Sequence, residues 1–93
     1  MASQKVKFDI GEKRHVRIDV QVVSGDKLPF LIRAARYELI DPDGNLEESG
    51  ECAIEDHEID AYIFPVKTGS YTLKYIYEVA DEIWIDPVKV VVS

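Results

Sequence analysis

The sequence predicts an all-β domain, built as a sandwich of two antiparallel sheets with about seven strands. Apolar and polar residues alternate with a period of two along almost the whole chain, and no segment shows a convincing helical period. Turn-forming residues separate these runs at intervals of roughly eight to twelve residues. The chain has 93 residues, the size of a single domain with one modest core. We therefore expect one domain over residues 1–93.

The first two strands are predicted at 5–10 and 15–23, on either side of Gly11. In the first, the apolar residues on one face are Val6, Phe8 and Ile10. In the second, apolar residues alternate with charged and polar ones, and the apolar face consists of Val16, Ile18, Val20 and Val22. Each run therefore has one face suited to a core.

A third strand, predicted at 30–40, contains a change of parity. Phe30, Ile32 and Ala34 share one face. The apolar residues that follow lie on the other face, and these are Ala35, Tyr37 and Leu39. The change predicts a bulge or bend at Ala34 and Ala35.

The remaining strands are predicted at 46–54, broken by Gly50, and then at 57–64, 70–80 and 84–93. The strand at 70–80 alternates best, with one face formed by Tyr71, Leu73, Tyr75, Tyr77 and Val79. Gly69 precedes Tyr71 by two residues, as in a tyrosine corner, where the phenol bonds back to the backbone at the turn before its strand. We assign Gly69 and Tyr71 this structural role. Together the strands predict an immunoglobulin-like sandwich, although the cysteine pair of antibody domains is absent.

The string Asp41-Pro42-Asp43-Gly44 raises the choice between a turn and a cation site. It lies between two predicted strands, with Pro suited to the second position of a turn and Gly44 suited to a positive φ. We interpret it as a hairpin turn in which Gly44 is structural. An EF-hand calcium loop needs Gly at its sixth position and Glu at its twelfth, and Leu46 and Cys52 occupy those places. A weak, incidental cation site there remains an alternative.

The composition argues against several classes of function. Eighteen Asp and Glu against eleven Lys and Arg give a formal charge of −7, and phosphate contacts supply most nucleic-acid affinity, so we expect no nucleic acid partner. No apolar run is long enough for a signal-peptide core or for a membrane span of about 20 residues. The single cysteine, Cys52, permits no internal disulfide. We expect a protein made in a cytoplasm, without membrane binding.

No catalytic, cofactor or metal site is predicted. Cys52 with His57 as base lacks the glycine-rich loop or helix N-terminus that stabilises developing charge. Glu47 and Glu48 are neighbours on a strand, so we expect their carboxylates to point to opposite faces. We therefore expect a protein that is not an enzyme and has no cofactor.

Three aromatic residues are candidates for an interface. In the strand at 57–64, Tyr62 and Phe64 lie opposite the apolar face that carries Ile63, and an outward aromatic pair is unusual for a monomer. Trp84, between two isoleucines, adds apolar surface near the start of the last strand, where an edge strand can pair with another chain. For all three, capping one end of the core is the alternative.

The order of these elements resembles the small immunoglobulin-like domains of tailed-bacteriophage structural proteins, in the layout of the N-terminal domain of the baseplate upper protein family. The matching features are the Gly11-Glu12 step, the run from Pro29 to Leu39, the Asp43-Gly44 hairpin and the Gly69-x-Tyr71 corner. The resemblance implies a non-enzymatic virion part, assembled in the bacterial cytoplasm. Baseplate upper proteins continue into further segments, so we expect a stand-alone copy to be a small head, neck, tail or decoration protein.

We therefore expect a structural or interaction module that acts through protein–protein contacts. The expected partners are other virion proteins or copies of the chain itself, in a homo-oligomer within the assembly. The alternative is a carbohydrate-binding or adhesion module, since such modules also use exposed aromatic side chains.

Overall fold

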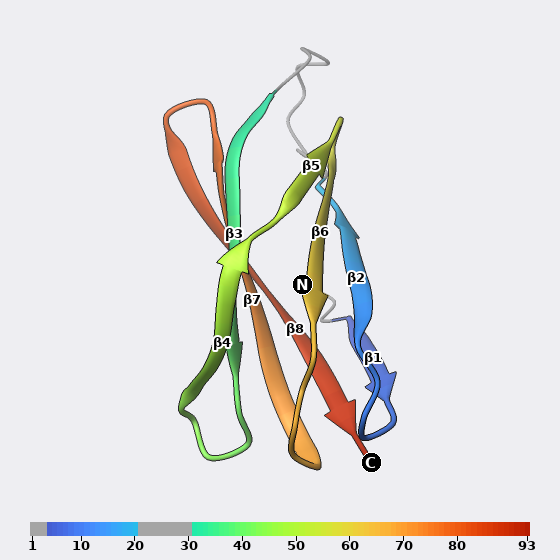
Figure 1. Cartoon of the computed structure of the whole chain (residues 1–93). Helices are drawn as coiled ribbons and strands as arrows, with labels where there is room; N and C mark the ends of the chain where they lie inside the picture. The colour runs from blue at the N-terminus through green and yellow to red at the C-terminus, as the bar shows by residue number, and fades with distance from the viewer. Residues whose placement is uncertain (1–3, 21–30) are drawn as a thin grey trace.

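A computed structural model of the chain describes residues 4–20 and 31–93. These residues form eight strands and no helix, as Figure 1 shows. The strands are β1 (Lys5–Phe8), β2 (Arg14–Asp19), β3 (Ile32–Ile40), β4 (Leu46–Glu51), β5 (Ala53–Glu55), β6 (Glu58–Ile63), β7 (Gly69–Val79) and β8 (Glu82–Val92). The all-β prediction is confirmed. Within the described ranges there is no helix that could span a membrane.

The strands form two sheets that enclose one core. The larger sheet has the order β1-β8-β7-β3-β4, and the smaller has the order β2-β6-β5 (Figure 1). Every pairing is antiparallel except that of β1 with β8, which is parallel and aligns Lys5 with Lys89. The prediction of purely antiparallel sheets is therefore wrong for β1, because a parallel partner 84 residues away leaves no mark on the alternation that sequence shows.

The predicted strand at 46–54 is two strands in the structure. β4 pairs with β3 in the larger sheet, whereas β5 pairs with β6 in the smaller one. Cys52 lies at the crossing and still donates its backbone N–H to the Ala35 carbonyl at 2.9 Å. The break comes at Cys52, two residues after the predicted break at Gly50, which lies within β4 and pairs with Tyr37. The change of sheet raises the number of described strands to eight.

The core lies between the two sheets and takes alternate residues mainly from β2, β3, β6, β7 and β8, whereas β4 and β5 contain no buried residue. Leu39, Ile59, Leu73 and Val90 are fully buried there. The face of β7 predicted to be apolar is buried along its whole length, from Tyr71 to Val79. The alternation that predicted the strands therefore also predicted the core.

The predicted bulge in β3 occurs close to its expected place. The β3–β7 register shifts between Ile32 and Ala34, one or two residues before the predicted position. Because of this shift Ile32 and Ala35 are both buried, although they are three positions apart and would face opposite sides of a regular strand. Phe30 and the end of the predicted second strand, 21–23, lie outside the described residues.

Two buried tyrosines connect the sheets through hydrogen bonds. Tyr75 on β7 donates its hydroxyl to the Val16 carbonyl on β2 at 2.5 Å. Tyr37 on β3 donates to the Tyr62 carbonyl on β6 at 3.2 Å and to the Glu48 carboxylate at 2.5 Å. Burial raises the pKa of both phenols, so both act as O–H donors at ordinary pH. These bonds fix how one sheet lies over the other.

Candidate functional site

The aromatic pair Tyr62 and Phe64 lies on the outer face of the smaller sheet. Tyr62 is 45 % exposed and Phe64, just after the end of β6, is 42 % exposed. Their neighbours Ala61 and Ile63 are fully buried. The two rings therefore project outward and leave the core to the residues between them.

Tyr62 has close neighbours on β2. Its ring stacks on His15, its cross-strand partner, with the ring centroids 4.3 Å apart and the planes inclined by 12°. The ammonium group of Lys13 lies 4.7 Å from the centroid of the same ring. The stacking and the cation–π contact hold the Tyr62 side chain in one orientation on the surface.

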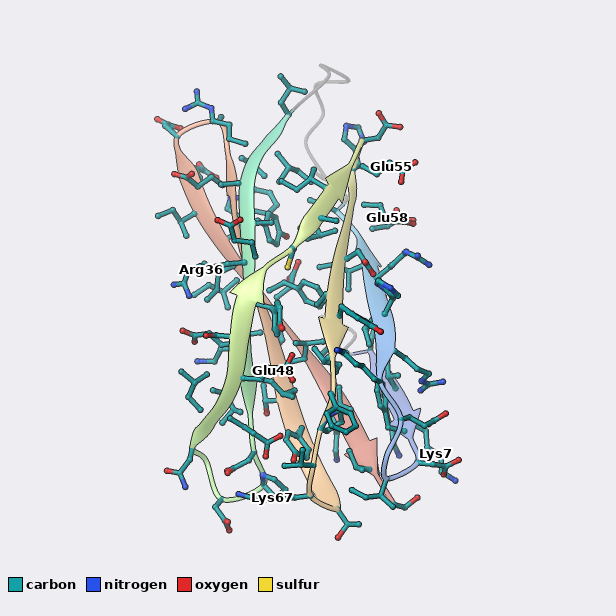
Figure 2. The ribbon with its side chains drawn as sticks, viewed as in Figure 1. Lys7, Arg36, Glu48, Glu55, Glu58 and Lys67 are labelled. Atoms are coloured by element: carbon teal, nitrogen blue, oxygen red, sulfur yellow. The ribbon has the colours of Figure 1, made fainter. Side chains whose placement is uncertain are left out.

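Charged residues continue this outer face beyond the aromatic pair. His15 Nδ1 lies 2.6 Å from Asp60 Oδ2, and Arg17 Nε lies 3.6 Å from Asp60 Oδ1 and 3.8 Å from Glu58. Figure 2 shows Glu58 and Glu55 at the end of this face near the β5–β6 turn. The Asp60 side chain is 16 % exposed, and its Oδ1 is buried without a hydrogen bond. β2 thus supplies the guanidinium group of Arg17 and the imidazole of His15, and β6 supplies the carboxylates of Glu58 and Asp60.

Trp84 is less exposed than Ile83 and Ile85 on either side of it. Its indole packs against the core, with its ring centroid 6.2 Å from that of Tyr77, and Nε1 donates to Glu82 at 2.7 Å. Ile83 and Ile85 are 67 % and 56 % exposed on the opposite face of β8. The apolar surface at the start of β8 is therefore formed by the isoleucines.

A shallow groove of about 310 Å³ lies on this outer face of the larger sheet. Its lining includes Ala34, Arg36, Ile76, Glu78 and Ile83. Figure 2 shows Arg36 projecting from β3 at this face. The alternation of each strand indicated which residues share a face, but the groove depends on the order of β8, β7 and β3 in the sheet, which sequence did not supply.

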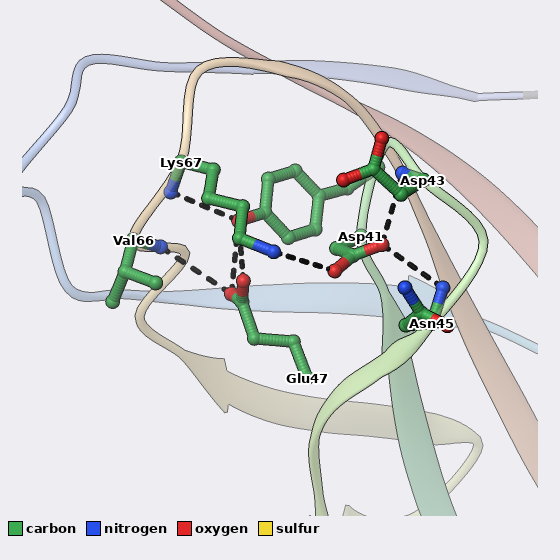
Figure 3. Close-up of polar contacts among 7 residues, drawn as sticks. Asp41, Asp43, Asn45, Glu47, Val66 and Lys67 are labelled. Atoms are coloured by element: carbon green, nitrogen blue, oxygen red, sulfur yellow. Dashed lines mark hydrogen bonds and ion pairs between the residues drawn. The ribbon is translucent and has the colours of Figure 1, made fainter.

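The Asp41 carboxylate accepts hydrogen bonds from groups within the protein. Its Oδ1 accepts backbone N–H bonds from Asp43 and Asn45, both at 2.9 Å, and its Oδ2 accepts a bond from Lys67 Nζ at 2.7 Å (Figure 3). The bond from Lys67, followed by those from the backbone, lowers the pKa of Asp41. Gly44 has φ +88, as its place in the turn requires. The segment is a hairpin turn, with a carboxylate that holds it closed.

Tyr71 lies beside this turn and joins it to the start of β7. Its hydroxyl accepts the backbone N–H of Lys67 at 3.0 Å and donates to Glu47, whose oxygens lie 2.8 and 2.9 Å away (Figure 3). Gly69 has φ +129, and a Cβ built on it would lie 2.8 Å from Pro42 Cγ. The contacts around Tyr71 and Gly69 hold the β3–β4 turn against the β6–β7 connection.

Glu47 and Glu48 do not point to opposite faces, contrary to the expectation from strand geometry. Glu48 accepts the Phe64 backbone N–H at 3.0 Å, and Glu47 accepts that of Val66 at 3.3 Å. Both carboxylates turn toward the same segment because the β3–β4 register shifts between Leu39 and Ile40. They satisfy backbone groups beyond the end of β6.

Cys52 is buried at the crossing between β4 and β5. Burial, followed by the nearby Asp60 charge, raises the pKa of its thiol to about 12. A thiol with such a pKa is not a nucleophile near neutral pH. In the described part of the chain, no three His, Cys, Asp or Glu side chains are grouped so that they could hold a metal ion.

Comparison with known proteins adds no relative. No family model, no curated protein and no solved structure matches the chain. The resemblance to phage immunoglobulin-like domains therefore stays a prediction.

Proposed function

We propose that the fold is of immunoglobulin type and that the chain is a non-enzymatic structural or interaction module. The strand order supports the first part. Strands D, E and B of an immunoglobulin domain correspond to β5, β6 and β2, and strands C′, C, F and G correspond to β4, β3, β7 and β8. The Tyr71 hydroxyl bond to Lys67 supports it further, since a tyrosine corner makes such a bond at the start of strand F.

The functional proposal is based on the outward-facing aromatic pair, Tyr62 and Phe64. Tyr62 and Phe64 are about half exposed on the outer face of the smaller sheet, opposite the face that packs in the core. Aromatic residues are enriched in the buried centres of protein interfaces, where charged residues surround them. Here Asp60, His15 and Arg17 form such a surrounding. The proposed partner is another virion protein or a copy of the chain, as part of a phage head, neck, tail or decoration layer.

The virion role is tested by mass spectrometry of purified phage particles after prophage induction in the source organism. We expect the tryptic peptide Thr68–Lys74 at a copy number like that of known virion parts. Particles that lack this peptide, from cells that contain the protein, would refute the virion role.

The interaction surface is tested by replacing Tyr62 and Phe64 together with Ser. We expect weaker assembly into particles, or weaker capture of virion proteins, while the urea midpoint changes little because both side chains are exposed. Ile10→Ser is the matched control, since Ile10 is 50 % exposed but lies outside this face. Equal effects of the control and the double variant would contradict the proposal, and loss of the fold would show that the pair is part of the core.

Carbohydrate binding is the second candidate, favoured by exposed rings next to hydrogen-bonding side chains. His15 stacks on the Tyr62 ring and the Lys13 ammonium also lies over it, so Phe64 would have to hold the sugar. This candidate predicts saturable binding of host-wall glycans by the monomer, lost when Phe64 is replaced. Binding of virion proteins without any binding of glycans excludes it.

A further inference from the structure

The outer face of the β7–β8 ribbon changes in character along its length. At the hairpin it is acidic, in the middle it is apolar, and at the far end it is basic. We call these parts the acidic end (Glu78 and Asp81), the apolar middle (Ile76, Ile83 and Ile85) and the basic end (Lys5, Lys7 and Lys89). Figure 1 shows the β7–β8 hairpin at one extreme of the molecule and the C-terminus at the other, and Figure 2 shows Lys7 close to the latter.

The basic end brings like charges together. The parallel pairing of β1 with β8 places Lys5 directly beside Lys89, with Lys7 two residues further along β1. All three lysines are exposed. No carboxylate among the described residues lies within ion-pair distance of them. Like charges on adjacent strands destabilise a sheet. The chain has a net charge of −7, yet none of its described carboxylates neutralises this cluster. A negatively charged partner would therefore stabilise it.

The apolar middle is contiguous, with Ile83 and Ile85 exposed and Ile76 half-buried beside them. Ile76 and Ile85 are cross-strand partners. Ile83 lies opposite Glu78, two residues nearer the hairpin than Ile85. The groove lined by Ile76 and Ile83 begins here. Neighbouring isoleucines that remain this exposed gain free energy if a partner covers them, by about 25 cal/mol for each Å² removed from water.

The acidic end complements the basic end in charge. Glu78 and Asp81 are exposed, and neither has an ion-pair partner among the described residues. Glu82, next to Asp81, is already bonded to Trp84. The ribbon therefore ends in unpaired negative charge at one extreme and unpaired positive charge at the other.

We propose that this face binds a second copy of the chain, turned by 180° so that the acidic end of each copy covers the basic end of the other. The apolar middle of each copy then covers that of its partner. A two-fold axis requires the same patch on both copies to be self-complementary, and the pattern acidic, apolar, basic has this property. This inference goes beyond the proposed function, because it adds a second surface on the larger sheet, whereas Tyr62 and Phe64 lie on the outer face of the smaller one.

The outer face of the whole five-stranded sheet, of which the ribbon is a part, is large enough for a stable contact. Its longest strands have eleven residues, about 36 Å, and five strands span about 24 Å. Three quarters of that rectangle is about 650 Å², close to the roughly 800 Å² that each partner buries in a standard interface. The net charge of −7 opposes association over long distances, and physiological salt screens this repulsion beyond about 8 Å.

The test is sedimentation of charge-reversed variants. One variant reverses the basic end (Lys7→Glu with Lys89→Glu) and another reverses the acidic end (Glu78→Lys with Asp81→Lys). We expect the wild type to form dimers, each variant alone to dimerise at least about tenfold more weakly, and an equimolar mixture of the two to form heterodimers. Glu55→Lys, with the same kind of charge change on the exposed strand β5, is the control and should dimerise as the wild type does.

A wild type that stays monomeric at every concentration overturns the proposal, and so does a dimer that both reversed variants retain. Ile85→Lys is a further variant that does not depend on the ends, and it should abolish the dimer while circular dichroism remains native. These failures are distinct from failure of the proposed function. A monomer that still enters particles through Tyr62 and Phe64 refutes the dimer alone, whereas a dimer absent from particles refutes the virion role alone.

Discussion

Replacing Gly69 with Ala should destabilise the protein by about 3 kcal/mol, because two costs act on one methyl group. The backbone of Gly69 has φ +129, where residues with a Cβ are strained by about 1–3 kcal/mol. The new Cβ would also lie 2.8 Å from Cγ and 3.1 Å from Cβ of Pro42, and overpacking of this kind costs about 1–3 kcal/mol. For a domain of this size, the sum lowers the melting temperature by about 15 °C.

The two costs are separable by a double-mutant cycle with Pro42→Ala, which removes the Cγ that makes the closest contact. Urea unfolding is followed by circular dichroism for the wild type, both single variants and the double variant. We expect Gly69→Ala to cost about 1 kcal/mol less in the Pro42→Ala background, with the m-value unchanged. An unchanged midpoint for Gly69→Ala would refute the reasoning altogether. A cycle without coupling would leave the backbone strain and refute the contact with Pro42.

Three further predictions concern buried polar groups. Tyr75→Phe removes the hydroxyl that donates to Val16, and it should lower the free energy of unfolding by about 1 kcal/mol in the same urea assay; no change would mean that the bond between the sheets contributes nothing. The Cys52 thiol, with its pKa raised to about 12, should react with a thiol reagent at neutral pH only in denaturant, and fast labelling of the native protein would contradict its burial. The pKa of Asp41 is lowered in the folded state, mainly by Lys67, so its stabilising effect is complete above the unfolded value of about 3.9 and is lost as the pH falls through the lower folded value. The urea midpoints of the wild type and Asp41→Asn should therefore differ at neutral pH and converge in acid, and a difference that grows in acid would reverse the assigned sign.

The sequence was informative wherever the alternation was long and uninterrupted. In β7 it predicted each buried residue from Tyr71 to Val79, because a strand with one face in the core repeats every two residues. In β3 it predicted a bulge from the change of parity at Ala34 and Ala35, and the register shift lies just before them, although Ala34 is exposed and does not share the buried face of Ile32. These features depend on residues close together in the chain.

The features that the sequence did not predict depend on which strands become neighbours. The crossing of the chain at Cys52 from one sheet to the other leaves the alternation unchanged, so one strand was predicted in place of β4 and β5. Glu47 and Glu48 turn the same way only because β4 shifts register against β3. The alternation around Trp84 shows that Ile83 and Ile85 oppose it, but not which of the two faces is covered. The structure shows the indole packed on the core and the isoleucines exposed.

The pairing of Lys5 with Lys89 gives a last prediction, in which the stability of the monomer and its self-association change in opposite directions. Lys5→Glu turns a repulsive pair on adjacent strands into an attractive one, so it should stabilise the monomer by about 0.5 kcal/mol in dilute solution at low salt. Lys7→Glu makes the same charge change opposite Val91, where there is no like charge to relieve, and should not stabilise. Both changes remove positive charge from the basic end, and both should therefore weaken the dimer. Equal urea midpoints for the two variants would show that Lys5 and Lys89 do not repel each other in the monomer. A gain for Lys5→Glu that disappears in high salt, together with a weaker dimer, indicates that the repulsion is retained because the second copy neutralises it.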